Sequence, residues 1–489
     1  MTPEAAVLGA LATPLFGAVL IAAAHDRPNL RETVTLVTAA LLFLQVASLL
    51  PVVLGGGRPA VELGAVMPGI ELTFVVEPLG MLFAAIASGL WIVNSLYSIG
   101  YMRGNKEHHQ TRFYVCFAGA LAATMGVAFA GNLFTLFLFY EALTLVTYPL
   151  VTHHGDAEAR SAGRLYLGVL VGTSIFFLLV AVVWTWVAAG TIDFTPGGIL
   201  RGKVSDATMG ILLALYVFGI GKAAVMPVHR WLPAAMVAPT PVSALLHAVA
   251  VVKAGVFSIV KVIVYVFGVD VIAGLASVEW LPFVAGFTII AASIVALRSD
   301  NLKRRLAYST VSQLSYIVLA AALLTPLSVI GAALHIATHA LGKITLFFAA
   351  GAIYTASHKT EVSELAGIGR KMPWTMAAFA IGSLSLIGIP PAAGFISKWF
   401  IVSGAWQAGN LMALAVLIAS ALLNAAYFLP IVHSAFFRPS PADGHAGHGE
   451  APWPMVVALM TTATATMALF FFADIPLRLA VQLVPAVGH

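Results

Sequence analysis

Long apolar segments separated by short polar stretches repeat along the whole chain. The segments are continuously apolar, which favours helices over the alternating strands of a membrane β-barrel. A bilayer core of about 30 Å needs about 20 apolar residues in each helix. The windows that reach this length are 4–24, 33–54, 75–100, 112–130, 132–152, 163–189, 208–227, 239–265, 280–297, 305–325, 327–356, 373–404, 410–437 and 455–475. The pattern predicts an all-α polytopic membrane protein with about 14 transmembrane helices.

The composition agrees with a membrane protein. Of the 489 residues, 60% are hydrophobic and 9% are charged, whereas a soluble domain carries about 25% charged residues. A water-soluble enzyme and a disordered chain are thereby excluded. The only cysteine, Cys116, excludes an intrachain disulfide and a cysteine metal cluster.

The positive charges divide unequally between the two sets of loops. In a layout of 14 helices, one set carries 16 of the 25 lysines and arginines, the other carries four, and five lie within helices. Loops rich in lysine and arginine stay in the cytoplasm. We therefore expect a multi-pass protein of a cell membrane, in bacteria the inner membrane, with both termini on the non-cytoplasmic side. The net charge of +5 reflects loops beside lipid headgroups, and nucleic acid is not an expected partner.

One carboxylate lies deep within an apolar window. Glu141 belongs to the window 132–152 and shares a polar stripe with Thr144 and Tyr148, at spacings i, i+3 and i+7. A charge at this depth costs about 3 kcal/mol and is usually functional. The alternative is a structural partner for a lysine, and we favour a role in transport.

Two of the lysines lie in segments interrupted by glycine and proline. Lys222 belongs to GIGKAAVMPVHRWLP, and Lys398 belongs to IGIPPAAGFISKWF. In transporters, broken helices at corresponding places in two halves of a chain mark the ion path. An unwound turn in a membrane needs polar partners, so it normally lines a cavity. Both lysines are therefore candidate members of the path.

Two histidines and a lysine share one helix face. His335, His339 and Lys343 are spaced i, i+4 and i+8 in the window 327–356. The pair HIATH lacks the glutamate of the zinc motif HExxH, and no third ligand follows nearby. Imidazole titrates near neutral pH, so a proton relay fits these residues better than a metal site. The sequence predicts no metal and no cofactor.

The window 239–265 contributes further ionisable residues. It contains His247 and, six residues later, Lys253 on a different face, and both are candidate relay residues. Lys261, at the end of this window, is interpreted as a snorkelling side chain. Glu77, at the start of the window 75–100, is interpreted as a carboxylate at the membrane interface.

The candidate residues suggest how a proton could move. Burial favours the neutral form of a lysine, whereas a nearby carboxylate favours the charged form. A change in the pairing of Glu141 with Lys222 would therefore load or release a proton on the lysine. Polar residues in the window 305–325 could hold water between such groups, or they could only pack helices. These residues are Ser309, Thr310, Ser312, Gln313, Ser315 and Tyr316.

Four sequence segments resemble one family of membrane subunits. They are the glutamate-containing LFTLFLFYEALTLVTYPL, then GKAAVMPVHRWLPAAMVAPTPVSALLHA, HIATHALGKITLFFAAG and IGIPPAAGFISKW. Together they resemble the antiporter-like subunits of respiratory complex I, of Mrp-type cation/proton antiporters and of membrane-bound hydrogenases, over roughly residues 70–440. The resemblance implies two inverted five-helix repeats with broken helices. It divides the chain into 1–110 (helices 1–3), 111–265 (first repeat), 266–437 (second repeat) and 438–489 (a loop and helix 14).

The resemblance also implies roles for single residues. Glu141 matches the glutamate of helix 5 and Lys222 the lysine of helix 7. His247 and Lys253 match connecting positions of helix 8, and Lys398 matches the terminal lysine of helix 12, which some members replace by glutamate. With His335, His339 and Lys343 these residues form the expected proton relay.

The resemblance favours the Mrp-type component named D. The length of the chain and the segment SELAGIGRKMPWTMAAFAIGSLSLIGIPP fit that component, whereas YSIGYM and TPVSALLHA resemble the largest antiporter-like component of complex I. The chain stops at His489, so we expect no lateral C-terminal helix of that larger component. The function expected is proton translocation within a monovalent cation (Na⁺)/proton antiporter, with other membrane subunits as partners. Alternatives are a pump module of a complex I-like NADH dehydrogenase or membrane-bound hydrogenase, a module of an inorganic-carbon uptake complex, and a scaffold with vestigial polar residues.

Overall fold

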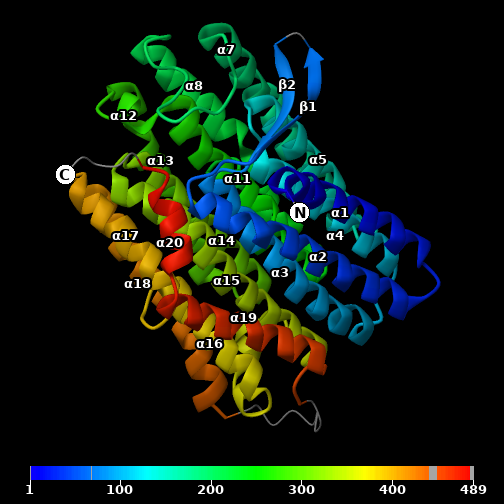
Figure 1. Cartoon of the computed structure of the whole chain (residues 1–489). Coiled ribbons are helices and arrows are strands. Elements are labelled where there is room, and N and C mark those ends of the chain that lie inside the picture. The colour runs from blue at the N-terminus through cyan, green and yellow to red at the C-terminus, as the bar shows by residue number, and fades with distance from the viewer. Residues whose placement is uncertain (1, 68, 440–448, 485–489) are drawn as a thin grey trace.

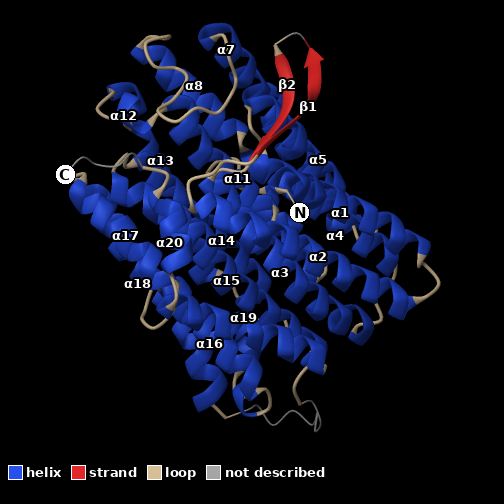
Figure 2. Ribbon diagram, in the orientation of Figure 1, coloured by secondary structure: helices blue, strands red, loops and turns tan. Residues whose placement is uncertain are grey.

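The computed structural model describes residues 2–67, 69–439 and 449–484, with the side chain of His247 left out. It is a bundle of helices with a single β-hairpin in the described part of the chain (Figures 1 and 2). The first elements are α1 (Pro3–Ala23), α2 (Pro28–Leu54), β1 (Ala60–Met67), β2 (Ile70–Val75), α3 (Pro78–Gly104), α4 (Gln110–Phe129) and α5 (Leu133–Val151).

Short 3₁₀ and π turns, labelled η, interrupt the helices that follow. The middle of the chain forms α6 (Ala157–Thr173), η1 (Ser174–Leu178), α7 (Leu179–Ala189), α8 (Asp206–Gly219), η2 (Gly221–Ala223), α9 (Trp231–Ala234), η3 (Ala235–Val237), α10 (Thr240–Ala244), η4 (Leu245–Val249), α11 (Val251–Val262), η5 (Ile263–Phe267), α12 (Val269–Ile272) and η6 (Ala276–Val278). The last part forms α13 (Trp280–Arg298), α14 (Leu302–Ala322), α15 (Pro326–Ser357), η7 (Val362–Leu365), η8 (Ile368–Arg370), α16 (Pro373–Ile387), α17 (Gly394–Gln407), α18 (Leu411–Phe437), α19 (Trp453–Phe471) and α20 (Asp474–Val481).

The all-α membrane architecture predicted from the sequence is confirmed. Ten helical segments of the described residues are long and apolar enough to cross a membrane. Each predicted window falls on helical structure, and the count of 14 spans stays a prediction. The hairpin β1–β2 and the short helix α20 were not predicted, because neither has the length of an apolar span.

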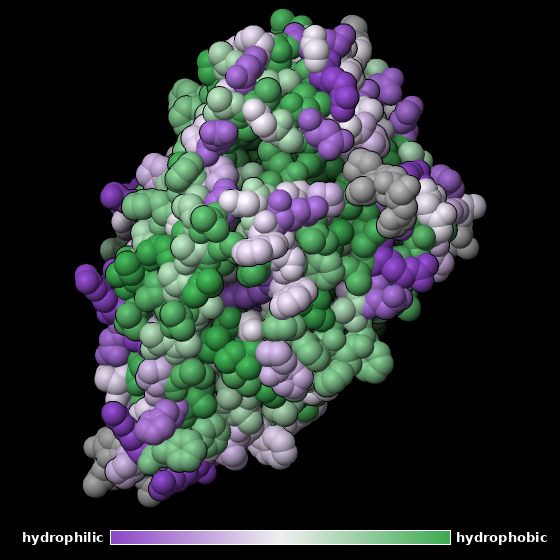
Figure 3. Space-filling view, turned by 90° about the vertical axis from the view of Figure 1, so that its left-hand side faces the viewer, coloured by the Kyte–Doolittle hydropathy of each residue, from purple (hydrophilic) through white to green (hydrophobic). Residues whose placement is uncertain are grey.

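The outer surface of the bundle is rich in large apolar side chains. Phe16 of α1, Phe176 of η1 and Trp406 of α17 are 66%, 72% and 74% exposed. Figure 3 shows broad hydrophobic areas on one face, with hydrophilic residues gathered mostly toward its margins. Such a surface fits lipid or a neighbouring membrane protein rather than water.

Helix α15 forms the centre of the second half of the bundle. Its 32 residues span about 48 Å, and its most apolar stretch is completely buried. A capping box between Thr325 and Ser328 fixes its first turn. A Cβ added at Gly331 would lie 2.8 Å from the backbone nitrogen of Ile401 in α17. This glycine therefore lets α15 and α17 approach closely, as small residues do in membrane bundles.

Two helices are broken where glycine and proline predicted a break. Helix α8 ends at Gly219, and η2 with Lys222 follows it. Helix α16 ends before Gly388, which adopts a φ of 92°, and α17 begins at Gly394. A positive φ is readily available only to glycine, which makes Gly388 a typical helix terminator.

The β-hairpin fastens one end of the bundle, which we call the hairpin end. Strands β1 and β2 are antiparallel, and β2 continues its contacts into the turn between α4 and α5. Gly131 N–H donates to the Thr73 carbonyl over 2.8 Å, and the Asn132 side chain donates to the Glu71 carbonyl over 2.7 Å. On its other side the turn receives Phe194, whose N–H donates to the Gly131 carbonyl. The hairpin thus positions the ends of α4 and α5.

Substitution of Gly331 by leucine should destabilise the bundle. The larger side chain would push α17 away from α15, and overpacking of this kind typically costs about 1–3 kcal/mol. The matched control is Gly168→Leu in α6, where an added Cβ meets nothing within 4 Å. We expect heating of the detergent-purified protein to abolish its monodisperse size-exclusion peak at a lower temperature for Gly331→Leu than for wild type or the control. Equal stability of the two variants would contradict this view of the α15–α17 contact.

Candidate functional site

Lys222 is completely buried at the break after α8. Its Nζ donates to the Tyr140 carbonyl over 2.8 Å and to Thr144 Oγ1 over 2.6 Å. Nζ also lies 3.2 Å from the centroid of the Tyr140 ring, and the main-chain N–H of Lys222 donates to the Tyr140 hydroxyl. A carbonyl, a hydroxyl and an aromatic face together form a cradle for an ammonium group.

Glu141 lies beside this cradle without entering it. The carboxylate is half-buried on α5, and its Oε1 has no hydrogen-bond partner among the described residues. The hydrogen bonds of the Lys222 ammonium go to Tyr140 and Thr144 instead. Thr144 is the member of the predicted polar stripe that meets the lysine. Glu141 can therefore act on Lys222 through its charge, whereas Tyr140 and Thr144 accept the hydrogen bonds of the lysine.

Helix α11 approaches this break because of a glycine. A Cβ at Gly255 would collide with the backbone of Lys222 and Ala223. Just before Gly255 along the chain, α11 carries Lys253, which is completely buried. The predicted relay residue His247 lies on η4, and its side chain lies outside the described part of the structure.

Lys253 meets the histidines of α15. Its Nζ lies 2.6 Å from His339 Nδ1, and the rings of His339 and His335 lie 5.8 Å apart between centroids. All three side chains are buried. The helix face predicted from the i, i+4 spacing therefore points toward α11, from a position 86 residues away along the chain.

His335 connects this group to the second broken helix. Its Nδ1 lies 2.8 Å from Ser397 Oγ on α17, and its Nε2 lies 3.1 Å from Gln313 Oε1 on α14. The carboxamide oxygen of Gln313 can only accept, so Nε2 carries a hydrogen and Nδ1 accepts from the serine in this arrangement. The ring of Tyr316 stacks on His335 with centroids 5.7 Å apart.

Lys398 follows Ser397 and is held by the end of α16. Its Nζ donates to the carbonyls of Leu386 and Ile387 over 2.5 and 3.2 Å. These are the last residues of α16, whose carbonyls have no intrahelical partner. Nζ also lies 4.7 Å from the centroid of the Tyr316 ring. The broken helix thus supplies the acceptors that the buried ammonium needs.

Lys343 has a cradle similar to that of Lys222. Its Nζ donates to the Leu306 carbonyl over 3.1 Å and to Ser309 Oγ over 2.5 Å. In both cradles a carbonyl acts together with a hydroxyl located within about one turn of the same helix. Lys343 lies one turn beyond His339 on α15. Its hydrogen bonds go to Leu306 and Ser309 of α14, at a different place from the contact between His335 and Ser397.

Sequence reasoning missed polar side chains of α18. Asn424 and Tyr427 are completely buried and bonded to each other. The Gln313 side chain donates to Asn424 Oδ1 over 3.4 Å. Asparagine in an apolar membrane helix is itself a signal, because its amide must find partners there.

The interpretation of Lys261 was wrong, because this side chain is completely buried rather than snorkelling. Glu77 is 6% exposed at the start of α3, and its place at the membrane interface stays a prediction. Lys261 Nζ lies 2.8 Å from Glu77 Oε2. The reason is that Phe194 covers the Lys261 ammonium and the segment after it pairs with the main chain of residues 265 and 266. The linear sequence presents this region as a helix terminus. The spacing of Lys253, Phe257 and Lys261 on one face of α11 could have indicated the correct placement.

A second group of ionisable residues lies at the opposite end of the bundle. Glu107 Oε2 lies 3.7 Å from His153 Nε2 and 3.8 Å from His154 Nδ1. Burial raises the pKa of Glu107, and burial lowers the pKa of His153 to about 4. A cavity of about 240 Å³ opens here, between Glu107, His154, Lys303 and the start of α10. Burial thus favours the neutral forms of Glu107 and His153 beside a space for solvent.

Within the described ranges, no group of three or more His, Cys, Asp and Glu side chains is placed to hold a metal ion. The two histidines of α15 instead bond to Lys253, Ser397 and Gln313. The arrangement is suited to proton transfer between neighbouring groups.

Comparison with known proteins places the chain in a family. Residues 130–423 match the family model described as "NADH:quinone oxidoreductase/Mrp antiporter, TM". The N subunit of the NADH-quinone oxidoreductase of Desulforudis audaxviator is 35% identical over 83% of each chain. The A/B component of a probable K⁺/H⁺ antiporter of Rhizobium meliloti is 31% identical over 83% of this chain and 41% of its own length. Hydrogenase-4 component B of Escherichia coli is 30% identical over 83% of this chain and 63% of its own.

Two solved structures share the fold. A chain of the Mrp complex of Dietzia sp. DQ12-45-1b superposes with a TM-score of 0.86 at 22% identity, covering 99% of this chain and 97% of that one. A chain of an archaeal membrane-bound sulfane sulfur reductase also gives 0.86, at 24% identity, covering 98% and 96%. The family match covers more than half of the chain, and the fold agrees with it over nearly the whole length. The chain therefore belongs to the family of membrane subunits shared by NADH:quinone oxidoreductases and Mrp antiporters.

Proposed function

We propose that the chain moves protons through the membrane within a multi-subunit assembly, along the buried line of groups from Lys222 to Lys398. The observation that carries this proposal is the row of close contacts Lys253–His339–His335–Ser397, which leads to Lys398 through the centre of the bundle. Ionisable groups in a membrane interior are costly and are kept for function. The relay consists of Glu141, Lys222, His247, Lys253, His335, His339, Lys343 and Lys398.

The contacts indicate how protons pass between these groups. A charged Lys253 donates to neutral His339 Nδ1, and transfer along this bond leaves a neutral lysine and an imidazolium. The His335 ring lies next to it, and Ser397 Oγ, which can donate and accept, bonds both His335 and Thr338. The buried hydroxyls of Ser243 and Ser315 have no hydrogen-bond partner among the described residues, so they are suitable binding sites for water.

Cradles without a fixed counterion suit a lysine that must change its charge. Neutral carbonyls and hydroxyls stabilise the ammonium of Lys222, Lys343 and Lys398 less than a carboxylate in direct contact would. In the cradles of Lys222 and Lys343 the neutral amine can remain in the same place, because the hydroxyl groups of Thr144 and Ser309 can also donate to it. Movement of a charge near Glu141 would then shift the proton affinity of Lys222. A change between two states needs an interaction that differs between them. We therefore infer that the moving charge near Glu141 belongs to a neighbouring subunit.

We propose that the assembly is a monovalent cation/proton antiporter, with Na⁺ as the candidate cation. The relative of Rhizobium meliloti, which is named as a component of a probable K⁺/H⁺ antiporter, supports an antiporter of monovalent cations. The second candidate is a complex I-like pump, which the 35% identity to the N subunit over 83% of both chains favours. Purification of the native assembly through a tag on this chain distinguishes them. Cation-dependent proton exchange without redox partners supports the antiporter, whereas co-purified iron–sulfur proteins support the pump.

We propose that residues 111–265 and 266–437 are inverted repeats. The helix breaks beside Lys222 and Lys398 support this division. The loops richer in lysine and arginine then face the cytoplasm, and both termini and the hairpin end face the opposite side.

Replacement of Glu141 by glutamine should abolish proton transport while the protein stays folded. The amide keeps the shape of the side chain and removes the charge that favours protonated Lys222. A positioned proton-transfer group typically contributes at least about a hundredfold to a rate. Proton flux is measured in vesicles that contain the whole complex, with Glu158→Gln at the start of α6 as the control. Wild-type flux through a fully assembled Glu141→Gln complex would refute the role of Glu141.

Lys398 should be replaceable by neither alanine nor arginine. Arginine keeps a positive charge and donors for the Leu386 and Ile387 carbonyls, but it does not release its proton. We therefore expect the Lys398→Arg complex to assemble normally and to lose its proton flux. The Lys398→Ala complex should also lose its proton flux, whatever its yield of assembled complex. Normal flux in the Lys398→Arg complex would show that the lysine has only a structural role.

The proposed orientation can be tested by labelling with a membrane-impermeant thiol reagent. In a Cys116→Ala background, Lys203→Cys should react from outside intact cells, and Arg304→Cys should react only after the membrane is opened. Both positions are exposed, so their accessibility depends on the side of the membrane. The reverse labelling pattern would show that the chain has the opposite orientation in the membrane.

A further inference from the structure

A buried ion pair at the hairpin end has no place in the relay described above. Lys261 Nζ lies 2.8 Å from Glu77 Oε2 and donates to the Ala130 carbonyl over 2.6 Å. Ala130 is the cap at the end of α4, where β2 pairs with it. The ring of Phe194 covers the ammonium, with its centroid 4.4 Å from Nζ. The pair is therefore anchored by the α4–α5 turn, the start of α3 and the end of α11.

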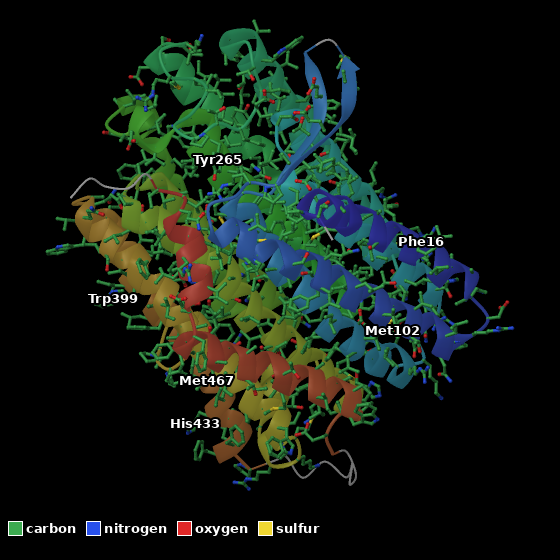
Figure 4. All side chains as sticks on the ribbon, viewed as in Figure 1. Phe16, Met102, Tyr265, Trp399, His433 and Met467 are labelled. Carbon is green, nitrogen blue, oxygen red and sulfur yellow. The ribbon has the colours of Figure 1, made fainter. Side chains whose placement is uncertain are left out.

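The pair borders a cavity that opens at this end. The cavity has a volume of about 370 Å³, and Glu77, Arg58, Tyr265, Asp270 and Gln482 are among its lining residues. Arg58 donates to the side chain of Gln482 over 2.9 Å, which links the α2 end to the end of α20. Figure 4 shows Tyr265 toward this end of the bundle, on the opposite side from α16 and α19. Such a volume has room for several water molecules, with charged side chains around it.

Helix α11 connects the pair to the relay. Lys253, Phe257 and Lys261 are spaced i, i+4 and i+8, so they share one face, and the two lysines are separated by about 12 Å along the axis. Phe257 fills the space between them and packs on Phe83 of α3, with ring centroids 5.1 Å apart. The inner lysine bonds to a histidine, and the outer lysine bonds to a carboxylate beside a cavity. An aromatic barrier separates the two.

A purely structural role explains these features less well. A buried ion pair typically adds little to stability compared with apolar residues of similar size. A structural role alone also does not account for its position beside a cavity with charged lining residues, on the same helix face as Lys253. A proton-conducting path that ends at Lys398 and begins at Lys222 also needs a place where protons exchange with water.

We propose that Glu77 and Lys261 form a proton-exchange site that connects the relay with the aqueous phase at the hairpin end, a proposal that rests on the proposed proton transport. The ammonium of Lys261 passes a proton to the carboxylate of Glu77, which leaves a neutral amine and a neutral carboxyl group. The carboxyl group then releases this proton to water in the cavity. The amine takes a new proton from the Lys253 side when Phe257 moves aside. One proton has then crossed, and both groups have regained their charges.

The first experiment tests access to the pair without measuring transport. In a Cys116→Ala background, Glu77→Cys places a thiol beside Lys261, and Ala250→Cys places one on the Lys253 side of Phe257, at the buried start of α11. In the intact complex, a membrane-impermeant methanethiosulfonate reagent added at the hairpin side should modify position 77 at least tenfold faster than position 250. An unreactive thiol at position 77, or equal rates at both positions, would overturn the proposal whether or not the complex transports protons.

The second experiment tests proton transfer in vesicles with the whole complex. The double variant Glu77→Gln/Lys261→Met removes both charges together, so no unpaired charge remains buried. We expect it to assemble and to lose most of the proton flux, at least tenfold. The matched control Asp474→Asn/Arg478→Met removes an exposed ion pair of α20 and should keep wild-type flux. Wild-type flux in the assembled double variant would overturn the proposal, whereas absence of flux in the wild-type complex would refute the proposed function itself.

Discussion

The cost of burying an ammonium group in a membrane protein determines how this bundle is built. Each of the buried lysines needs acceptors, and main-chain carbonyls supply most of them. The Tyr140, Leu306 and Ala130 carbonyls accept from Lys222, Lys343 and Lys261. Lys398 donates hydrogen bonds to the free carbonyls at the end of α16. The acceptors of Lys261 and Lys398 lie at helix ends, where carbonyls lack intrahelical partners, whereas Tyr140 and Leu306 lie inside α5 and α14 and act together with a hydroxyl of the same helix.

The kind of acceptor separates the lysines into two groups. Lys222, Lys343 and Lys398 are held by neutral groups, and Lys253 by a histidine. Lys261 is in direct contact with a carboxylate. Neutral acceptors tolerate both charge states of an amine, whereas a carboxylate in contact favours the charged state until it takes a proton itself. The interior of the bundle can thus change its protonation with small structural movements, and the pair at the hairpin end must transfer its proton within the pair.

The fold could be predicted from the sequence to the level of its spans and breaks. Apolar windows of membrane length, and glycine and proline beside Lys222 and Lys398, act locally and need no tertiary information. The hairpin β1–β2 could not be predicted in this way, because its place depends on main-chain bonds to the α4–α5 turn. Resemblance to a known family supplied the prediction of inverted repeats, and the comparisons established the family itself.

The sequence by itself determined which ionisable residues lie in apolar segments and which of them share a helix face, since both follow from composition and helical period. Only the tertiary structure decided their partners. Lys222 contacts Thr144 rather than Glu141, Lys253 meets His339, and Lys261 pairs with Glu77. The physical reason is that these helices are apolar on nearly every side, so hydrophobic periodicity does not fix their rotation or their neighbours. The packing of small residues such as Gly255 and Gly331 fixes both, and with them the site.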